Sequence, residues 1–445
     1  MMGRLFEQLI FRWVRLFYSR VEVRGSWPDS GPVIYVLNHP NGLLDPALVM
    51  AARLERVTFL AKSTLFAMPA VGWTARQFGA LPVFRAVDVG LRGAAADAED
   101  MADRNEATFA VCRARLHQGR ALALFPEGKT HGAPQLLPIR TGAARVALTT
   151  ACEAGWHSGL IMVPVGLWYE DMTRFRTRVI LNVGRKVGVD RWQQVYEEDA
   201  RAAVQQLTAE VEKRLEATLL QAESHRLLRR VSLLAAWTAP GEDGHAAGEQ
   251  LDWSARLLRG HSYLRVQAPE RIERIKQTSK SFGIMLQTAG IDNPRDLELQ
   301  RAGRGWLTKR VGWLVVMALP ALAGAGVGAI PWGVIRVLAH RVRRTEAGTI
   351  KLLGGTLLSG LSVAAWAMVL AFTAGIWWAV GLLVLAPGCL YAVLRWYELY
   401  QETQTAISVR RLQRRRTPLV EYLTRCREAL TEAVHDALVF AEKGR

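Results

Sequence analysis

Two long stretches without a charged residue constrain this chain more than any other feature of its sequence. Residues 311–335 form the first stretch, with 25 residues, and residues 352–394 form the second, with 43. A helix needs about 20 apolar residues to cross the hydrocarbon core of a bilayer. The second stretch is therefore long enough for two crossings that fold back near Gly375, and we expect a membrane-embedded helical hairpin there.

The first stretch leaves two arrangements open. Pro320, Pro331 and the glycines between 324 and 328 would disturb a straight helix. Arginines and lysines flank the stretch on both sides, and such flanks favour the cytoplasmic face. A re-entrant hairpin at 311–335 would keep both flanks on that face, so it is favoured over a single span.

The first 20 residues predict an amphipathic helix that lies in a membrane interface. Their apolar residues recur at helical spacing, and arginines occupy the rest of the helix surface. An ordinary amphipathic helix packed on its own domain is the alternative. The arginines also interrupt any apolar core, which argues against a cleaved signal peptide.

Composition narrows the class of partner. The net charge is +17 while half of the residues are hydrophobic, which indicates an anionic partner and an apolar environment. The arginine runs flank the apolar stretches, so we expect anionic membrane lipids as partners and no nucleic acid. Four widely spaced cysteines predict neither a disulfide framework nor a zinc site, and they favour a reducing compartment.

Short apolar runs alternate with helical patterns between residues 21 and 185, within a domain expected to extend to residue 225. This alternation predicts an α/β domain with a central, mostly parallel sheet flanked by helices. The expected strands are 33–37, 58–61, 81–84, 121–125, 160–165 and 177–183, and the expected helices are 46–54, 64–77, 99–118 and 142–155. Downstream we expect a helical region at 226–305 with a flexible loop at 239–250, membrane-embedded segments at 306–400, and a basic cytoplasmic helix at 401–445.

His39 and Asp45 form the first candidate for chemistry. His39 lies just after the apolar strand 33–37, and Asp45 follows six residues later at the start of a helix. An imidazole held by a carboxylate can take a proton from an alcohol. The alternative reading makes His39 a core histidine and Asp45, followed by Pro46, a helix N-cap.

Two further segments carry candidate anion-binding residues. Arg85 directly follows the strand at 81–84, and its planar guanidinium suits a phosphate. Lys62, directly after the strand at 58–61, is a similar candidate for binding a phosphate. The alternative for each is a solvated strand-end cation.

The segment after the strand at 121–125 reads Pro-Glu-Gly-Lys-Thr-His. Gly128 would let backbone amides approach a ligand, and Lys129 and Thr130 add donors. Glu127 would fit by binding acceptor hydroxyls or orienting cations, whereas His131 is expected at the surface. Arg140 precedes a helix whose N-terminus is another potential anion site.

Taken in order, four motifs carry a resemblance to a known family. Asn-His-x5-Asp-Pro, Gly-x-Leu-Pro-Val-x-Arg, Phe-Pro-Glu-Gly-x-Thr and Val-Pro-Val-Gly follow one another over residues 20–220. In this order they resemble the glycerolipid acyltransferases, which include glycerol-3-phosphate and lysophosphatidic-acid acyltransferases. The commonest family pattern has four residues between His and Asp. The five found here, in a His-Pro-Asn form, resemble the fungal-type glycerol-3-phosphate/dihydroxyacetone-phosphate branch.

The resemblance implies O-acyl transfer from acyl-CoA, or from another acyl thioester such as acyl carrier protein, to glycerol 3-phosphate. His39 would be the general base, Asp45 would orient it, Arg85 would hold the acceptor phosphate, and Glu127 with Gly128 would position the acceptor. Neither a metal nor an organic cofactor is implied. A lysophospholipid acceptor is the close alternative, and a membrane scaffold with an acyltransferase-like fold is the alternative without catalysis. We expect a membrane protein, integral or monotopic, whose catalytic domain faces the cytoplasm, at the inner membrane if the source is bacterial.

Overall fold

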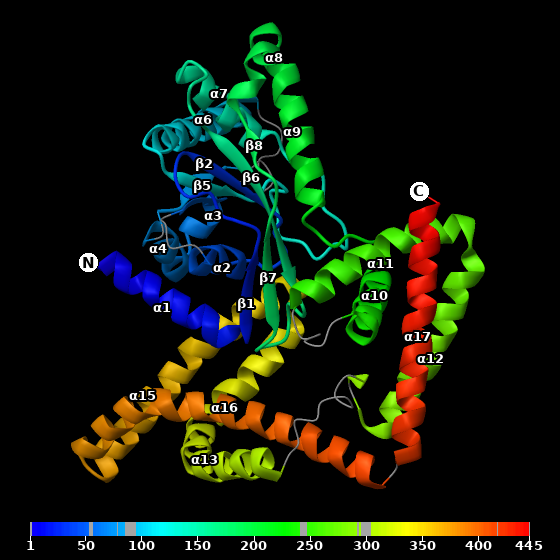
Figure 1. Cartoon of the computed structure of the whole chain (residues 1–445). Helices are drawn as coiled ribbons and strands as arrows, with labels where there is room; N and C mark the ends of the chain where they lie inside the picture. Colours follow the sequence, from blue (N-terminus) through cyan, green and yellow to red (C-terminus); the bar gives the residue numbers. More distant parts are fainter. Residues whose placement is uncertain are drawn as a thin grey trace. The chain divides into compact units, whose positions relative to one another are not determined.

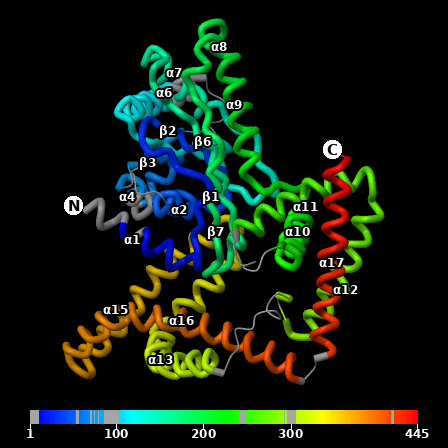
Figure 2. Tube along the Cα trace, in the orientation of Figure 1, coloured from blue at the N-terminus to red at the C-terminus, as the bar shows by residue number. Residues whose placement is uncertain are grey.

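The structure is a computed structural model, which describes residues 2–52, 57–77, 79–84, 95–240, 247–291, 293–294, 304–415 and 417–444. Figures 1 and 2 show the course of the chain. It divides into two compact units, and each is described by itself. The first comprises Met1–Glu223 with Arg344–Thr349, and the second comprises Ser224–Arg343 with Ile350–Arg445.

A mostly parallel sheet of eight strands forms the centre of the first unit. The strand order is β1-β7-β6-β2-β5-β3-β4, with β8 paired to β6. Strand β6 runs antiparallel to β7 and β8, and the remaining neighbours are parallel. The strands are β1 (Arg20–Arg24), β2 (Val33–Leu37), β3 (Val57–Lys62), β4 (Leu81–Val83), β5 (Ala121–Leu124), β6 (Ile161–Tyr169), β7 (Arg178–Val183) and β8 (Val187–Gly188). The predicted fold class and all six predicted strands are confirmed, whereas β1 and β8 were not predicted.

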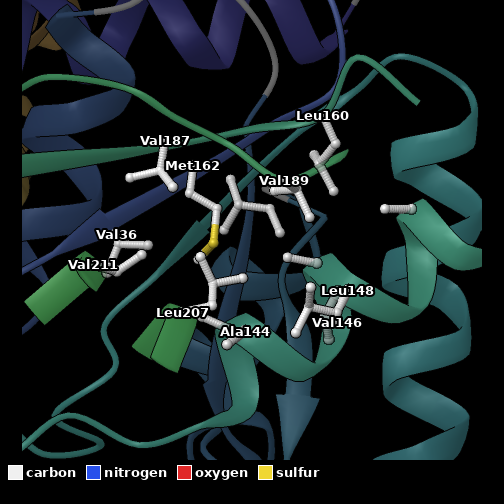
Figure 3. Close-up of a cluster of buried hydrophobic side chains, with 14 of the residues drawn as sticks. Val36, Ala144, Val146, Leu148, Leu160, Met162, Val187, Val189, Leu207 and Val211 are labelled. Carbon is white, nitrogen blue, oxygen red and sulfur yellow. The ribbon is translucent and has the colours of Figure 1, made fainter. Parts of the chain in front are cut away.

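Helices cover this sheet, and one face carries the main apolar core. Its helices are α1 (Met2–Phe17), α2 (Leu44–Ala52), α3 (Ser63–Phe66), α4 (Pro69–Gln77), α6 (Ala95–His117), α7 (Gly142–Glu153), α8 (Gln193–Glu198), α9 (Ala200–Glu216) and α14 (Arg344–Thr349), with a 3-10 turn at Asp190–Trp192. Figure 3 shows Met162 of β6 surrounded by Leu148 of α7 and by Leu207 and Val211 of α9. Strand β2 is buried along its whole length, as expected for a central parallel strand.

The last turns of α1 pack within the first unit. Val14 and Phe17 are buried, and the Arg176 guanidinium donates hydrogen bonds to the carbonyls of Arg15 and Leu16. Part of this helix thus has the packed role that the alternative reading describes. Its placement in a membrane interface stays a prediction.

Among its described residues, the second unit contains helices and turns but no strand. Its helices are α10 (His225–Thr238), α11 (Ala247–Gln267), α12 (Pro269–Ala289), α13 (Arg304–Arg341), α15 (Gly355–Thr373), α16 (Ile376–Arg415) and α17 (Thr417–Lys443), with a π-helical turn at Ile350–Gly354. In the part of the chain that the structure describes, three helical segments, Gly305–Arg341, Arg344–Thr373 and Ile376–Arg414, are long and apolar enough to cross a membrane. The chain turns at Gly375, which has a φ of +103°, between α15 and α16. Half of the expected loop at 239–250, residues 241–246, lies outside the described residues, and residues 247–250 form the start of α11.

Candidate active site

The site begins where β2 ends, in the middle of the sheet. Asn38 follows the last strand residue, and its side chain pairs with the backbone of Leu167 on β6. The amide Nδ2 donates to the Leu167 carbonyl at 3.2 Å, and the Leu167 N–H donates to Oδ1 at 2.7 Å. These two hydrogen bonds to the neighbouring strand fix the start of the loop, and therefore the position of the His39 backbone.

His39 and Asp45 are in direct contact. The His39 Nδ1 lies 2.8 Å from Asp45 Oδ2, and the Asn41 N–H donates to the same oxygen at 2.8 Å. The His39 ring stacks on Phe125 with the centroids 4.1 Å apart, which fixes its plane. Because Nδ1 faces the carboxylate, Nε2 is the nitrogen left to meet a substrate. The His39 side chain is 18% exposed, whereas Asp45 is fully buried.

The five-residue spacer is accommodated by a tight turn. The Leu44 N–H donates to the Asn41 carbonyl at 3.0 Å, and Gly42 takes a φ of +39°. Helix α2 begins at Leu44, so Asp45 lies inside the first turn rather than before it. The N-cap reading of Asp45 is therefore wrong, because its carboxylate points back to the loop and accepts from Asn41.

A second partner of Asp45 comes from the far end of β6. The Tyr169 hydroxyl donates a hydrogen bond to Asp45 Oδ1. Burial, together with the neighbouring Asp45 charge, raises the pKa of Tyr169 well above its usual range, so the hydroxyl keeps its proton and remains a donor. Tyr18 lies behind it, with the ring centroids 5.8 Å apart, and burial also raises the pKa of that phenol. Neither tyrosine belongs to a motif, so nothing local in the sequence pointed to them.

Glu127, after β5, joins the His39 loop to the segment that carries His131 and Leu137. Its Oε1 accepts the His39 N–H at 3.0 Å, and its Oε2 accepts the Leu137 N–H at 3.0 Å. The same Oε2 is hydrogen-bonded to His131 Nε2. The expectation that His131 is a surface residue is wrong, since its half-buried ring contacts the buried Glu127 carboxylate.

Of the remaining predicted residues, Lys62, Lys129 and Thr130 follow or end parallel strands of the sheet. Lys62 ends β3, and because β2, β5 and β3 are parallel neighbours, it shares the sheet edge with His39 and Glu127. Its side chain is exposed, as are those of Lys129 and Arg140, while Thr130 is half-buried. Arg85 lies outside the described residues.

Gly128 and Arg140 approach each other closely. The Arg140 N–H donates to the Pro126 carbonyl at 2.9 Å. Gly128 has a φ of +68°, and a Cβ there would lie 2.8 Å from Arg140 Nε. The positive φ at 128 favours glycine, and the absence of a Cβ lets the Arg140 side chain lie against this turn.

A distant segment also packs on the loop that carries the histidine. Helix α14 lies between the two apolar stretches in sequence but belongs to the first unit. A Cβ on Gly348 would lie 2.7 Å from Leu44 Cδ1 and 3.0 Å from Asn41 Oδ1, and a Cβ on Gly42 would lie 3.1 Å from Thr349 Oγ1. The loop between His39 and Asp45 is therefore covered by residues some 300 positions downstream, which sequence motifs do not reveal.

The sequence of this chain is similar to those of several known acyltransferases. Residues 20–168 match the family model described as Acyltransferase. An uncharacterized acyltransferase of Schizosaccharomyces pombe is 24% identical over 438 residues, covering 80% of this chain and 64% of the relative. Glycerol-3-phosphate O-acyltransferase 2 of Saccharomyces cerevisiae is 26% identical over 197 residues, covering 44% of this chain and 26% of the relative. A lyso-ornithine lipid O-acyltransferase of Pseudomonas aeruginosa is 32% identical over 149 residues, covering 34% of this chain and 47% of the relative. The chain spans less than two thirds of the length of each relative.

Proposed function

We propose that this chain, whose residues 20–168 form an acyltransferase domain, transfers a fatty acyl group from acyl-CoA, or another acyl thioester, to a hydroxyl of glycerol 3-phosphate. The observation that carries the proposal is the fixed contact between His39 Nδ1 and Asp45 Oδ2, which leaves Nε2 directed away from the carboxylate. The five-residue spacer between them and the similarity to a yeast glycerol-3-phosphate acyltransferase support this acceptor.

In the proposed reaction, His39 Nε2 takes the proton of the acceptor hydroxyl as its oxygen attacks the thioester carbonyl. Asp45 holds the ring and stabilises the positive charge that develops on it. When the tetrahedral intermediate collapses, the carbon–sulfur bond breaks and the imidazolium returns the proton to the leaving thiolate. The products are the acyl ester and the free thiol, and no acyl-enzyme is formed.

Glu127 acts in this proposal through the backbone. Both of its carboxylate oxygens bind protein donors, so its role is to join the His39 loop to the segment that carries His131 and Leu137. Binding of the acceptor phosphate falls to the cations of the same sheet edge, Lys62 and Arg140, together with Arg85. Gly128, Lys129 and Thr130 supply backbone and side-chain donors beside them.

Tyr169 is a positioning residue in the same scheme. A buried carboxylate needs donors to offset its lost hydration, and Asp45 receives them from His39, from the Asn41 backbone and from Tyr169. The tyrosine occupies Oδ1, so that Oδ2 is turned to the histidine. It does not contact the reacting atoms.

An acceptor comparison tests the proposed substrate. The purified chain in lipid vesicles receives labelled acyl-CoA with either glycerol 3-phosphate or a lysophospholipid. Labelled lysophosphatidate from glycerol 3-phosphate is the expected product. Activity on lysophospholipids alone would refute that acceptor and support the second candidate, which the similarity to a lyso-ornithine lipid acyltransferase favours.

We further infer that α13 enters the membrane and returns, and its contacts with α16 support the first half of this path. Trp396 Nε1 donates to the Leu314 carbonyl at 2.9 Å. Gly324 lies so close to Cys389 that a Cβ would meet its carbonyl oxygen at 2.2 Å. At 1.5 Å per residue, Trp396 is about 30 Å from the turn at Gly375 and Cys389 about 20 Å, so α13 moves toward the turn between these contacts.

The contacts of α13 with α15 support the return path. Ser362 Oγ donates to the Val327 carbonyl at 2.7 Å, about 20 Å from the turn. Ile335 lies against Gly354, about 30 Å from the turn, where a Cβ on the glycine would meet Ile335 Cδ1 at 2.8 Å. These contacts support a path in which both ends of the apolar stretch lie at one level of the membrane and its glycine-rich middle lies deepest.

Accessibility of single cysteines tests this path. With the native cysteines replaced, cysteines at Gly305, Arg343 and Ala374 are exposed in sealed vesicles to a maleimide that cannot cross the membrane. Positions 305 and 343 should react from the same face, and position 374 from the other. Reaction of 305 and 343 from opposite faces would establish a single span instead.

A further inference from the structure

A cavity in the second unit combines cations with indole rings. Its volume is about 520 Å³, and its lining includes Trp306, Lys309, Arg310 and Trp313 of α13 and Arg395 and Leu399 of α16. The Arg310 guanidinium lies over the Trp306 ring, 4.9 Å from its centroid. The acyl-transfer scheme makes no use of this cavity.

The charges of the cavity suit a phosphate. Arg310 pairs with Glu402 at 2.5 Å and Arg395 pairs with Glu398 at 2.5 Å. Both pairs are partly exposed, so each contributes little binding energy and can rearrange. A guanidinium has five N–H donors, so one carboxylate does not exhaust it, and Lys309 adds an ammonium group.

The level of the cavity in the membrane suits a lipid headgroup. Arg395 is the first charged residue after the apolar stretch and lies about 30 Å from the turn at Gly375, which matches the thickness of the hydrocarbon core. Tryptophan side chains favour this interfacial level. Beyond the cavity, α13 exposes Val316 and Leu319, which offer an apolar surface to acyl chains.

We propose that this cavity binds the phosphate headgroup of an anionic phospholipid. Lys309, Arg310 and Arg395 are the cations that contact the phosphate, and the acyl chains of the lipid lie along α13. The proposal rests on the membrane placement of α13 and α16 but not on acyl transfer. A lipid in this position would hold the N-terminal part of α13 at the membrane surface.

Photocrosslinking tests the proposal on the full chain in phosphatidylcholine vesicles. A photoactivatable phosphatidylglycerol is added, and labelled peptides are mapped by mass spectrometry. We expect labels on the peptides of α13 and α16 that line the cavity. Excess phosphatidylglycerol should remove them, whereas excess phosphatidylcholine should not.

The double variant K309Q/R395Q should lower this labelling about ten-fold or more, because each basic residue near a phospholipid headgroup adds to binding. The matched control R336Q/R343Q also removes two exposed cations, Arg336 in the last turns of α13 and Arg343 just after this helix, and should label as the parent does.

Three results would overturn the proposal: equal competition by phosphatidylcholine, displacement by inorganic phosphate, or an equal loss in both double variants. The competition experiments use the parent chain, so they decide the matter even if a variant fails to fold. Acyl transfer is measured separately, and its absence would leave the lipid result unaffected.

Discussion

Removal of the Tyr169 hydroxyl tests how the Asp45 carboxylate is held in the proposed active site. In Y169F, Asp45 Oδ1 loses its phenolic donor while His39 and the Asn41 N–H still bind Oδ2. A hydrogen bond to a buried charged group contributes about 1.5–3 kcal/mol. Since about 1.4 kcal/mol changes a rate ten-fold, the full range corresponds to about 10- to 100-fold. We expect a fall in kcat near the lower end, because the contact with the histidine persists.

The assay follows release of the free thiol while acyl-CoA and the acceptor are varied in turn, each with the other substrate saturating. Because Tyr169 does not touch either substrate in this scheme, both KM values should stay within about two-fold. Burial and the Asp45 charge keep the pKa of Tyr169 well above its usual range, so its hydroxyl does not ionise during the assay. The alkaline limb of the pH profile should therefore be the same in the parent and in Y169F.

The matched control is Y35F, which removes a phenolic hydroxyl from another fully buried tyrosine, one that packs edge-on against Trp27. It should change kcat by less than about two-fold. The reasoning would be refuted if Y169F kept the parent kcat, or if Y35F lost as much activity as Y169F.

Two further predictions concern packing and thiol chemistry. G348A should lower kcat several-fold with membrane association unchanged, because the added Cβ would press on Leu44 and Asn41 at an overpacking cost of about 1–3 kcal/mol. The rate of thiol release measures kcat, and the control is G355A, where the added Cβ meets open space. Burial raises the pKa of Cys112 to about 12, so at pH 8 this thiol should stay unmodified by iodoacetamide while the exposed Cys152 reacts, as peptide mass spectrometry would reveal; equal modification of both would contradict the fold.

Whether a feature of the fold or of the candidate site could be predicted from the sequence depended on how far apart in the chain its contacting residues lie. The strands and the pairing of His39 with Asp45 were predictable, because strand periodicity and a six-residue separation are local properties. The bond between Tyr169 and Asp45 joins residues 124 positions apart, and it arises only when β6 lies beside β2.

Other features escaped prediction for related reasons. Strand β1 lies at the sheet edge with no fully buried residue, and β8 has only two residues, so neither forms an apolar run like those of the central strands. The packing of α14 on the histidine loop depends on small residues, Gly42 and Gly348, which carry no hydrophobic signal.

The most direct test of the account is the rate of acyl transfer by H39A in vesicles, measured with acyl-CoA and glycerol 3-phosphate. Loss of the general base should reduce kcat by about 100-fold or more, while membrane association and the unfolding temperature stay close to those of the parent. A variant that remains folded and membrane-bound and turns over at the parent rate would contradict the assignment of His39 as the base.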